Sequence, residues 1–353
     1  MIKSFKPKLL FIYPNQFGYL TDGYKYCEHL RHSFDITYIC FDQGFERLVL
    51  PDINVIYMPY TIGKISRLIH FYRFLIKLTL QENFEALFTI QFEFCFIIGL
   101  FAKSKVKILD YRSGDLSTNA YKRKFKNQLM WFDSLFFQNV SVISAGVRDI
   151  LLLNRYKTHI LPLGADIISV QPHSFERLDL IYVGSFSLRN IHQTIEGLAL
   201  FLATRKVLSK LISYTIIGFG NEQEEKVIIN SIEKSGLNDL VYFIGRKKYT
   251  DLSTYFDVCN IGVSYVPITP YYQYQPVTKL FEYMMSGMPV IATETYENKL
   301  IVNENNGVLI CDSPEDFCNG LVTIYNKRNL FNSYEIRKSV ESYSWENIER
   351  KSA

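Results

Sequence analysis

The fold of this chain is decided by the segment Pro276-Val277-Thr278-Lys279-Leu280-Phe281-Glu282-Tyr283-Met284-Met285-Ser286-Gly287-Met288-Pro289-Val290-Ile291-Ala292. A proline is favourable near the start of a helix. Gly287 is typical of the residue that ends one. Pro289 precedes a β-branched run that favours a strand. The segment therefore predicts a helix, a tight turn and a strand, in that order.

The expected helix carries a polar pair that suits a nucleotide. Lys279 and Glu282 stand three residues apart, so they share one helix face. Amides at a helix N-terminus favour the binding of a pyrophosphate, and the lysine adds positive charge. The carboxylate can accept hydrogen bonds from two ribose hydroxyls. The alternative is an exposed Lys–Glu pair on a solvated helix, which contributes little to stability.

Short β-branched and aromatic runs alternate with longer amphipathic stretches along the rest of the chain. This alternation is typical of βαβ units and parallel sheets. The expected strands are residues 8–13, 35–40, 54–58, 86–90, 107–110, 141–143 and 159–161 in the first half, and 178–183, 213–217, 241–244, 261–264, 290–292 and 308–310 in the second. Helices are expected between them, for example at residues 64–80 and 121–137.

The length of 353 residues fits two domains better than one. A polar stretch at residues 169–177 marks the boundary. We expect an N-terminal acceptor-side domain at 1–168 and a C-terminal nucleotide-sugar domain at 169–335. Residues 336–353 form a C-terminal helix that could cross back to the N-terminal domain.

Charge is distributed unevenly along the chain. Residues 1–170 hold 21 lysines and arginines against 14 aspartates and glutamates, whereas the remainder holds 18 against 21. The basic first half is expected to face an anionic partner, either membrane lipid or a phosphorylated acceptor. Nucleic acid is not expected, because no nucleic-acid-binding motif occurs. The six cysteines form no CxxC pair, which favours reduced thiols in a cytoplasmic protein.

Glycines at expected strand ends form further candidate phosphate contacts. Gly184 and Ser185 follow one strand and precede a helix that begins near Arg189, a cation able to pair with phosphate. Gly218 follows another strand, and Arg246 comes just after a third. Carboxyl ends of parallel strands are where open sheets bind ligands, but turn glycines are the alternative at each position.

The pattern P-x-x-K-x-x-E-Y-x-x-x-G-x-P-V-I-A, formed by residues 276–292, resembles the donor-site signature of glycosyltransferase family four, the group 1 glycosyltransferases. Residues 161–166, 183–198, 305–309 and 343–346 resemble further segments of that family. The resemblance is strong over residues 160–350 and weaker before them. It implies an α/β protein of the GT-B fold, with two Rossmann-like domains whose parallel sheets face each other across a donor and acceptor cleft.

The resemblance also implies a nucleotide-sugar donor, with a UDP- or GDP-sugar expected. Glu282 would hold the ribose, and the amides of Val277, Thr278 and Lys279 would meet the diphosphate. The complete donor-binding set is Gly184, Ser185, Arg189, Gly218, Arg246, Tyr274, Val277, Thr278, Lys279 and Glu282. Two positions depart from the family: Tyr274 stands where a second glutamate is frequent, and Ser185 where an arginine is usual.

In the first half, two polar segments are acceptor-side candidates. Gly18 and Asp22 follow the first expected strand, and Gly18 would permit close backbone approach. Asp110, Arg112 and Asp115 follow a later strand. We expect Asp22, Arg112 and Asp115 to be catalytic, and Gly18 and Asp110 to lie on the acceptor side. The alternatives are an Asp-Gly turn and a buried Asp–Arg pair.

No D-x-D triplet occurs in the sequence. That triplet is typical of metal-dependent transferases, so neither a metal nor another cofactor is expected. The resemblance implies a retaining, hexosyltransferase-like enzyme that transfers sugar to a glycan or lipid-linked acceptor in bacterial surface polysaccharide synthesis. The alternatives are a non-catalytic sugar-nucleotide-binding or assembly subunit and a nucleotide-sugar epimerase.

Two expected helices of the first half are candidates for contact with the inner face of the cell membrane. The helix at 64–80 has an apolar face opposite Arg67, Arg73 and Lys77. In the helix at 121–137 we expect Phe125, Leu129, Phe132 and Phe136 to be buried and Lys126, Met130 and Phe137 to lie on the other side. Basic residues beside exposed apolar ones favour anionic lipid. An ordinary solvated surface helix is the alternative.

Overall fold

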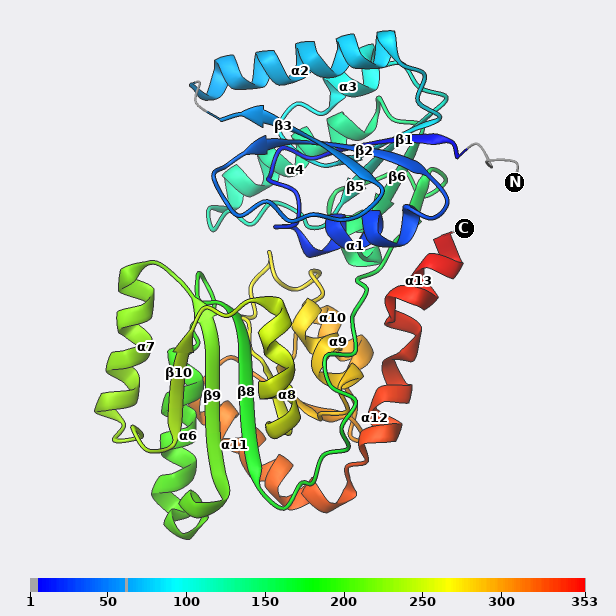
Figure 1. Cartoon of the computed structure of the whole chain (residues 1–353). Coiled ribbons are helices and arrows are strands. Elements are labelled where there is room, and N and C mark those ends of the chain that lie inside the picture. The colour runs from blue at the N-terminus through cyan, green and yellow to red at the C-terminus, as the bar shows by residue number, and fades with distance from the viewer. Residues whose placement is uncertain (1–5, 61–62, 353) are drawn as a thin grey trace. The chain divides into compact units, whose positions relative to one another are not determined.

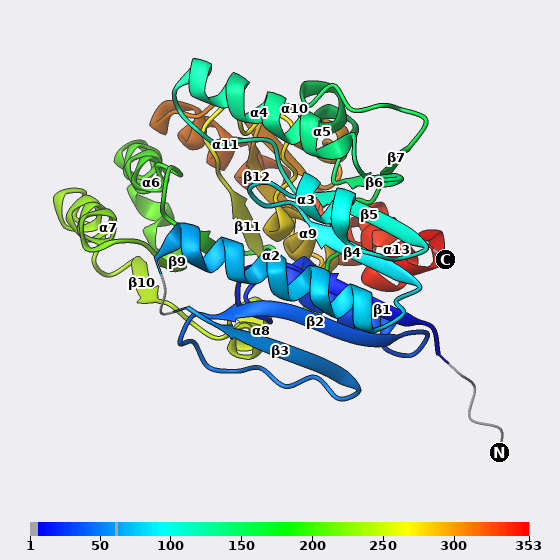
Figure 2. The ribbon, with the colours of Figure 1, turned by 90° about the horizontal axis from the view of Figure 1, so that it is seen from above.

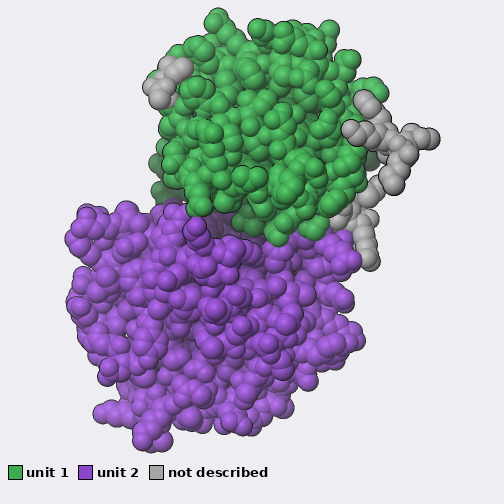
Figure 3. All heavy atoms as spheres, viewed as in Figure 1, with its two compact units in different colours: residues 1–162 green, residues 163–353 purple. Residues whose placement is uncertain are grey.

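The computed structural model describes residues 6–60 and 63–352, and of residues 349–352 only the backbone. The chain divides into two compact units, Met1–Pro162 and Leu163–Ala353, shown in two colours in Figure 3. Each unit is an α/β structure with its own parallel sheet (Figure 1). Among the described residues, no helix is both long and apolar enough to cross a bilayer.

The N-terminal unit contains a seven-stranded parallel sheet in the order β3-β2-β1-β4-β5-β6-β7. Its strands are β1 (Lys8–Ile12), β2 (Asp35–Asp42), β3 (Ile53–Pro59), β4 (Ala86–Ile90), β5 (Val106–Tyr111), β6 (Asn139–Val142) and β7 (Thr158–Ile160). Its helices are α1 (Thr21–Leu30), α2 (Lys64–Gln81), α3 (Phe96–Phe101), α4 (Ala120–Ser134) and α5 (Ala145–Ile150). Helix α3 contacts both α2 and α4, and Figure 2 shows it between them.

Strand β1 lies at the centre of this sheet. Leu9 pairs with Ile36 of β2 on one side and with Ala86 of β4 on the other. The following residues of β1, Leu10 to Ile12, are fully buried, which is why the strand is apolar without alternation. Strand order reverses between β1 and β4, and the carboxyl ends at such a point are the usual ligand position of open α/β sheets.

The C-terminal unit contains a six-stranded parallel sheet in the order β10-β9-β8-β11-β12-β13. Its strands are β8 (Leu178–Ser185), β9 (Ile212–Phe219), β10 (Val241–Gly245), β11 (Ile261–Ser264), β12 (Val290–Thr293) and β13 (Gly307–Ile310). Its helices are α6 (His192–Thr204), α7 (Glu222–Lys234), α8 (Leu252–Val258), α9 (Thr278–Met285), α10 (Tyr296–Ile301), α11 (Pro314–Lys327), α12 (Ser333–Val340) and α13 (Trp345–Ser352). This is the strand order of a Rossmann sheet.

Helices α6 and α11 pack against each other in this unit. The close approach requires a glycine, because a Cβ at Gly197 would lie 2.5 Å from the Pro314 carbonyl oxygen. The expected α/β class, with a parallel sheet in each half, is confirmed.

The expected packing of α4 is wrong. Phe125, Leu129 and Phe132 are exposed, whereas Met130 and Phe137 are buried. The face of α4 that packs inward carries Asp133, whose carboxylate accepts a hydrogen bond from the backbone N–H of Phe96 at 3.1 Å. A buried polar bond at the start of α3 therefore orients the helix, and its largest apolar side chains point outward.

Candidate functional site

Helix α9 places the Lys279–Glu282 pair predicted from the sequence. The two side chains form an ion pair, and Glu282 is only 1% exposed. The helix is anchored by Tyr283, whose hydroxyl oxygen accepts a 2.7 Å hydrogen bond from the backbone N–H of Val183 in β8. The Glu282 carboxylate is therefore held on a buried, fixed element rather than on a solvated surface.

The Glu282 carboxylate has a second neighbour that the sequence did not identify. The hydroxyl of Tyr249, in a short 3₁₀ turn at Tyr249–Asp251, lies 3.1 Å from Glu282 Oε1 and 3.0 Å from Asp166 Oδ2. Burial, together with the two carboxylates, raises the pKa of Tyr249, so this hydroxyl keeps its proton. Polar oxygens of three distant segments thus meet beside Lys279.

A cavity of about 210 Å³ lies at the N-terminus of α9. Six residues predicted to bind the donor line it: Gly184, Ser185, Arg189, Val277, Thr278 and Lys279. The carboxyl ends of β8 and β11 and the start of α9 form its wall. The structure therefore brings most of the predicted donor-binding set into one place.

Three buried atoms of residues lining this cavity have no hydrogen-bond partner within the described part of the chain: Arg189 Nη1, Ser264 Oγ and Gln275 Oε1. The guanidinium of Arg189 stacks 4.4 Å from the ring centre of Tyr272. Buried polar atoms are nearly always paired, so these three call for a polar ligand. A cation, a hydroxyl and an amide oxygen together suit a ligand with both anionic and hydroxyl groups. Neither Ser264 nor Gln275 was among the site residues predicted from the sequence.

Four predicted donor residues do not line the cavity: Glu282, whose contacts are described above, and Gly218, Arg246 and Tyr274. A Cβ at Gly218 would lie 2.3 Å from the Gly184 carbonyl oxygen, so this glycine permits close strand packing. The guanidinium of Arg246 lies over the Phe219 ring at 4.6 Å. The ring of Tyr274 packs against Tyr296, with centroids 5.2 Å apart.

In the N-terminal unit, Arg112 is buried between two carboxylates. Its Nε donates to Asp22 Oδ2 at 2.9 Å and lies 3.7 Å from Asp110 Oδ2, while Nη1 donates to the Leu161 carbonyl oxygen at 3.0 Å. The Ser141 hydroxyl donates to Asp110 Oδ1 at 2.6 Å. Strand β5 and helix α1 thus place three of the predicted residues in one buried cluster.

This cluster also holds unpaired atoms. Asp22 Oδ1, Asp110 Oδ2 and Arg112 Nη2 have no hydrogen-bond partner among the residues that the structure describes. The cluster therefore contains the buried Asp–Arg ion pair that was the alternative to a catalytic role. It also contains three polar atoms that could still bond a ligand.

Asp115 and Gly18 are not part of the cluster formed by Asp22, Asp110 and Arg112. Asp115 pairs with Lys126 at 3.0 Å and accepts from the Ser117 amide, so it is not joined to Arg112 by any of these bonds. Gly18 has φ +91°, and a Cβ there would lie 2.5 Å from Leu48. A side chain at residue 18 is therefore excluded by both backbone conformation and packing.

Residues 177–327 match the family described as glycosyl transferases, group 1. The match lies within the C-terminal unit, which is thus similar to the group 1 glycosyltransferases over these residues. No curated protein matches the sequence.

Solved structures match almost the whole chain. They include sucrose-phosphate synthase from Thermosynechococcus elongatus, at 16% identity and a TM-score of 0.73 over 98% of this chain and 97% of that one. Anabaena HepE in complex with UDP and glucose matches at 14% identity and 0.76, over 98% of each chain. WaaG, a glycosyltransferase involved in lipopolysaccharide biosynthesis, matches at 15% and 0.70, over 98% of each. At these identities the likeness shows the fold, and the predicted GT-B class is confirmed.

Metal ligands were not expected from the sequence. Within residues 6–60 and 63–352, no group of three or more His, Cys, Asp and Glu side chains could hold a metal ion. Of the described cysteines, Cys311 is exposed, Cys318 is partly exposed and the other four are buried and free.

Two buried carboxyls of the N-terminal unit, Asp110 and Asp133, predict a pH-dependent contribution to stability. Burial raises the pKa of Asp110 to about 6 although Arg112 opposes the change, and burial also raises the pKa of Asp133 to about 6. Both carboxyls titrate near pH 4 in an unfolded chain. These two carboxyls therefore bind protons more tightly in the folded unit, so their contribution to its stability is fully present below about pH 4 and is lost as pH rises through about 6.

The variant Asp110→Asn is expected to reduce this slope, and Asp110→Asn with Asp133→Asn to reduce it further. Urea midpoints measured from pH 4 to pH 7 test this. Equal slopes in the parent and the double variant would show that these carboxyls do not shift on folding.

Proposed function

We propose that the protein transfers a sugar from a nucleoside-diphosphate sugar to a glycan or lipid-linked acceptor. The observation that carries this proposal is the α9 cavity, where Arg189, Ser264 and Gln275 have unpaired buried atoms beside Lys279. Such an arrangement suits a diphosphate joined to a hydroxyl-rich sugar. The family match of residues 177–327 supports the same chemistry.

In this proposal the donor lies along α9. The amides of Val277, Thr278 and Lys279, together with Arg189, bind the diphosphate, because the helix N-terminus carries a positive partial charge. The Glu282 carboxylate accepts hydrogen bonds from the ribose hydroxyls. The solved complexes of HepE with UDP and UDP-glucose support a UDP-sugar as the first donor to test.

Departure of the diphosphate is then favoured by fixed positive charge. Preorganised donors and cations stabilise the charge that develops on the leaving group, so transfer proceeds without a divalent metal. We further propose that Gly184 and Ser185 lie close to the diphosphate. Gly218, Arg246 and Tyr274 would contribute indirectly, by positioning the loops around the cavity. The configuration of the transferred sugar is retained, as the family resemblance implies.

The N-terminal unit supplies the acceptor-side groups in this proposal. Asp22 and Asp110 offer the unpaired oxygens that an acceptor hydroxyl can bond, and Arg112 stabilises negative charge. Asp115 and Gly18 take part by positioning the acceptor, because Gly18 permits a close backbone approach.

The proposed setting is bacterial surface polysaccharide synthesis on the cytoplasmic side of the cell membrane. The likeness to WaaG supports this setting. The exposed apolar side chains of α4 lie beside Lys122 and Lys124, which favours binding to an anionic membrane surface.

A thermal-shift series with UDP, GDP, ADP, CMP and TDP, with and without magnesium, tests the proposal. A ligand at 100 times its Kd stabilises the folded state by about 2.7 kcal/mol, which raises Tm by a few degrees. We expect one diphosphate, UDP first, to give this shift equally in both conditions. A response to none of them would contradict the proposed donor site.

A second candidate is a non-catalytic sugar-nucleotide-binding or assembly subunit, favoured by Tyr274 at the position of the family's second glutamate. It predicts the same thermal shift without consumption of UDP-sugar when membrane extract is added. An epimerase would instead convert the donor without any acceptor.

A further inference from the structure

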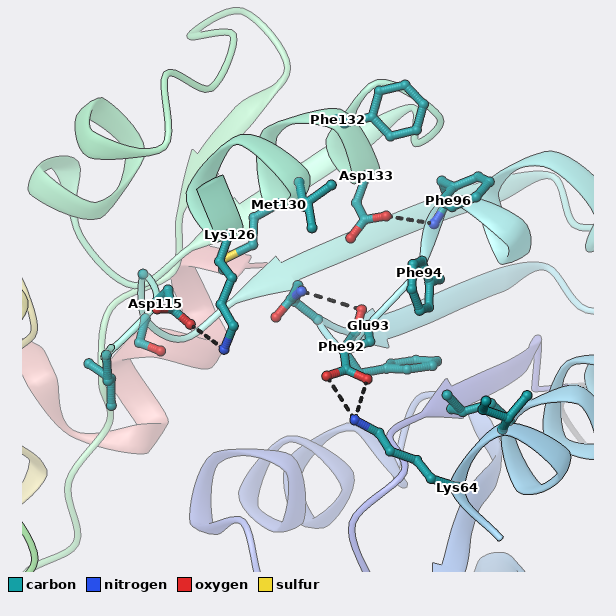
Figure 4. A pocket seen from close by; sticks show the side chains of 17 residues that line it. Lys64, Phe92, Glu93, Phe94, Phe96, Asp115, Lys126, Met130, Phe132 and Asp133 are labelled. Atoms are coloured by element: carbon teal, nitrogen blue, oxygen red, sulfur yellow. Dashed lines mark hydrogen bonds and ion pairs between the residues drawn. The ribbon is translucent and has the colours of Figure 1, made fainter. Parts of the chain in front are cut away.

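A second, larger cavity lies within the N-terminal unit (Figure 4). Its volume is about 920 Å³, at the upper end of the range of small-molecule sites, about 300–1,000 Å³. It is lined by the segments that follow β4 and β5 and by parts of α2 and α4. Carboxyl ends of parallel strands are a ligand-binding position, yet no step of the proposed transfer accounts for a cavity of this size.

The lining of this cavity is mainly apolar. Phenylalanines 92, 94, 96 and 132 line it together with aliphatic side chains of α2 and α4. Phe94 has φ +64° and is 51% exposed. A bulky residue in the left-handed region is strained, and such strain concentrates at ligand sites.

Several polar side chains of the cavity already have partners. Lys64 lies 2.9 Å from Glu93, Lys126 lies 3.0 Å from Asp115, and Asp133 accepts from the Phe96 amide (Figure 4). Among the lining residues, all of which the structure describes, no buried polar side-chain atom lacks a hydrogen-bond partner. The donor cavity has three such atoms. A glycan binds through hydrogen bonds, whereas an apolar chain needs none, so this lining favours a chain.

The surface around the cavity indicates where such a chain comes from. Ile65 on α2 and Tyr121 and Phe125 on α4 are 77%, 88% and 59% exposed. Lys122 and Lys124 are exposed on the same turn of α4 as these aromatic residues. Exposed apolar groups beside cations are typical of contact with an anionic membrane, and the positive charge complements an anionic head group.

We propose that this cavity binds the apolar chain of a membrane lipid with an anionic phosphate head group. In deepening the function proposed above, this inference makes the acceptor a lipid-linked sugar rather than a free glycan. The binding of the chain is a separate property of the N-terminal unit and can be measured without any donor.

Dodecyl phosphate and farnesyl phosphate, below their micelle concentrations, are the probes, with inorganic phosphate as the head-group control. Isothermal titration calorimetry at two temperatures is expected to show binding of a chain probe at least tenfold tighter than that of inorganic phosphate. The heat-capacity change should be negative, as expected when apolar surface is buried. Tighter binding of farnesyl than of dodecyl phosphate would identify an isoprenoid carrier, and the reverse an acyl lipid.

Variants that fill the cavity provide the control. Leu129→Trp and, from the opposite wall, Leu68→Trp should weaken binding of the chain probes at least tenfold. Leu135→Trp, at the C-terminal end of α4 and outside the cavity, should change it less than twofold. A far-UV circular dichroism spectrum and a urea unfolding midpoint equal to the parent's show that each variant is folded.

The outcomes separate the two proposals. A UDP response with no chain-probe binding, or with equal probe binding in parent, Leu129→Trp and Leu68→Trp, would overturn the lipid site alone. Chain-probe binding that both variants weaken, with no response to any nucleotide, would overturn the proposed transferase alone.

Discussion

Replacing Glu282 with alanine is expected to weaken UDP binding about 100-fold. In the proposed complex this carboxylate accepts hydrogen bonds from two ribose hydroxyls. Each hydrogen bond to a charged group contributes about 1.5 kcal/mol. Their combined loss corresponds to roughly two orders of magnitude in Kd. Glu282 is nearly inaccessible and pairs with Lys279, so water cannot readily replace the lost partner. Calorimetric titration with UDP measures the change directly.

The matched control is Glu222→Ala. Glu222 pairs with Lys226 at 2.6 Å on one turn of α7, but both side chains are exposed. Its removal likewise leaves a lysine without its carboxylate and should alter UDP binding less than twofold. If Glu282→Ala bound UDP as tightly as Glu222→Ala, the donor would not lie along α9.

The polar pair on α9 was predictable from the sequence because its determinants are local. A proline just before the helix, a spacing of three residues and a terminating glycine are all contained in residues 276–292. The strands were predictable for the same reason, since each is a short apolar run bounded by turn residues. The expected range at 86–90 coincides with β4, and that at 261–264 with β11.

The remaining members of the donor site depend on long-range packing. Tyr249 reaches Glu282 across 33 positions of sequence, and also meets Asp166 from the start of the C-terminal unit. Ser264 ends a buried strand with no local pattern that distinguishes it from a core serine. Only the sheet order, which sets β8 beside β11, brings it to Gly184 and Arg189.

The orientation of α4 could not be predicted from the sequence for a different reason. Helical periodicity identifies an apolar stripe but does not say whether that stripe packs inward. Here the Asp133 bond to the Phe96 amide turns the opposite side toward the sheet. Phe125 and Leu129 are consequently exposed, and this reversal creates the apolar surface on which the lipid site depends.

Replacing Arg112 with methionine is expected to destabilise the N-terminal unit by about 3–5 kcal/mol. Removal of one partner from a buried ion pair leaves uncompensated charge, here on Asp22 and Asp110. The chain has two tryptophans, so in a Trp345→Phe background Trp131 on α4 becomes the only one. Its fluorescence during urea unfolding then reports on this unit alone.

Two comparisons decide whether the loss comes from buried charge. Arg155→Met breaks an exposed pair with Asp149 in the same unit and should cost less than about 1 kcal/mol. Adding Asp22→Asn and Asp110→Asn to Arg112→Met should recover part of the lost stability, because neutral amides are less costly to bury than carboxylates. If Arg112→Met unfolded at the same urea concentration as Arg155→Met, the cluster would not stabilise the fold. Its unpaired oxygens and guanidinium nitrogen would then be left with the acceptor-side role alone.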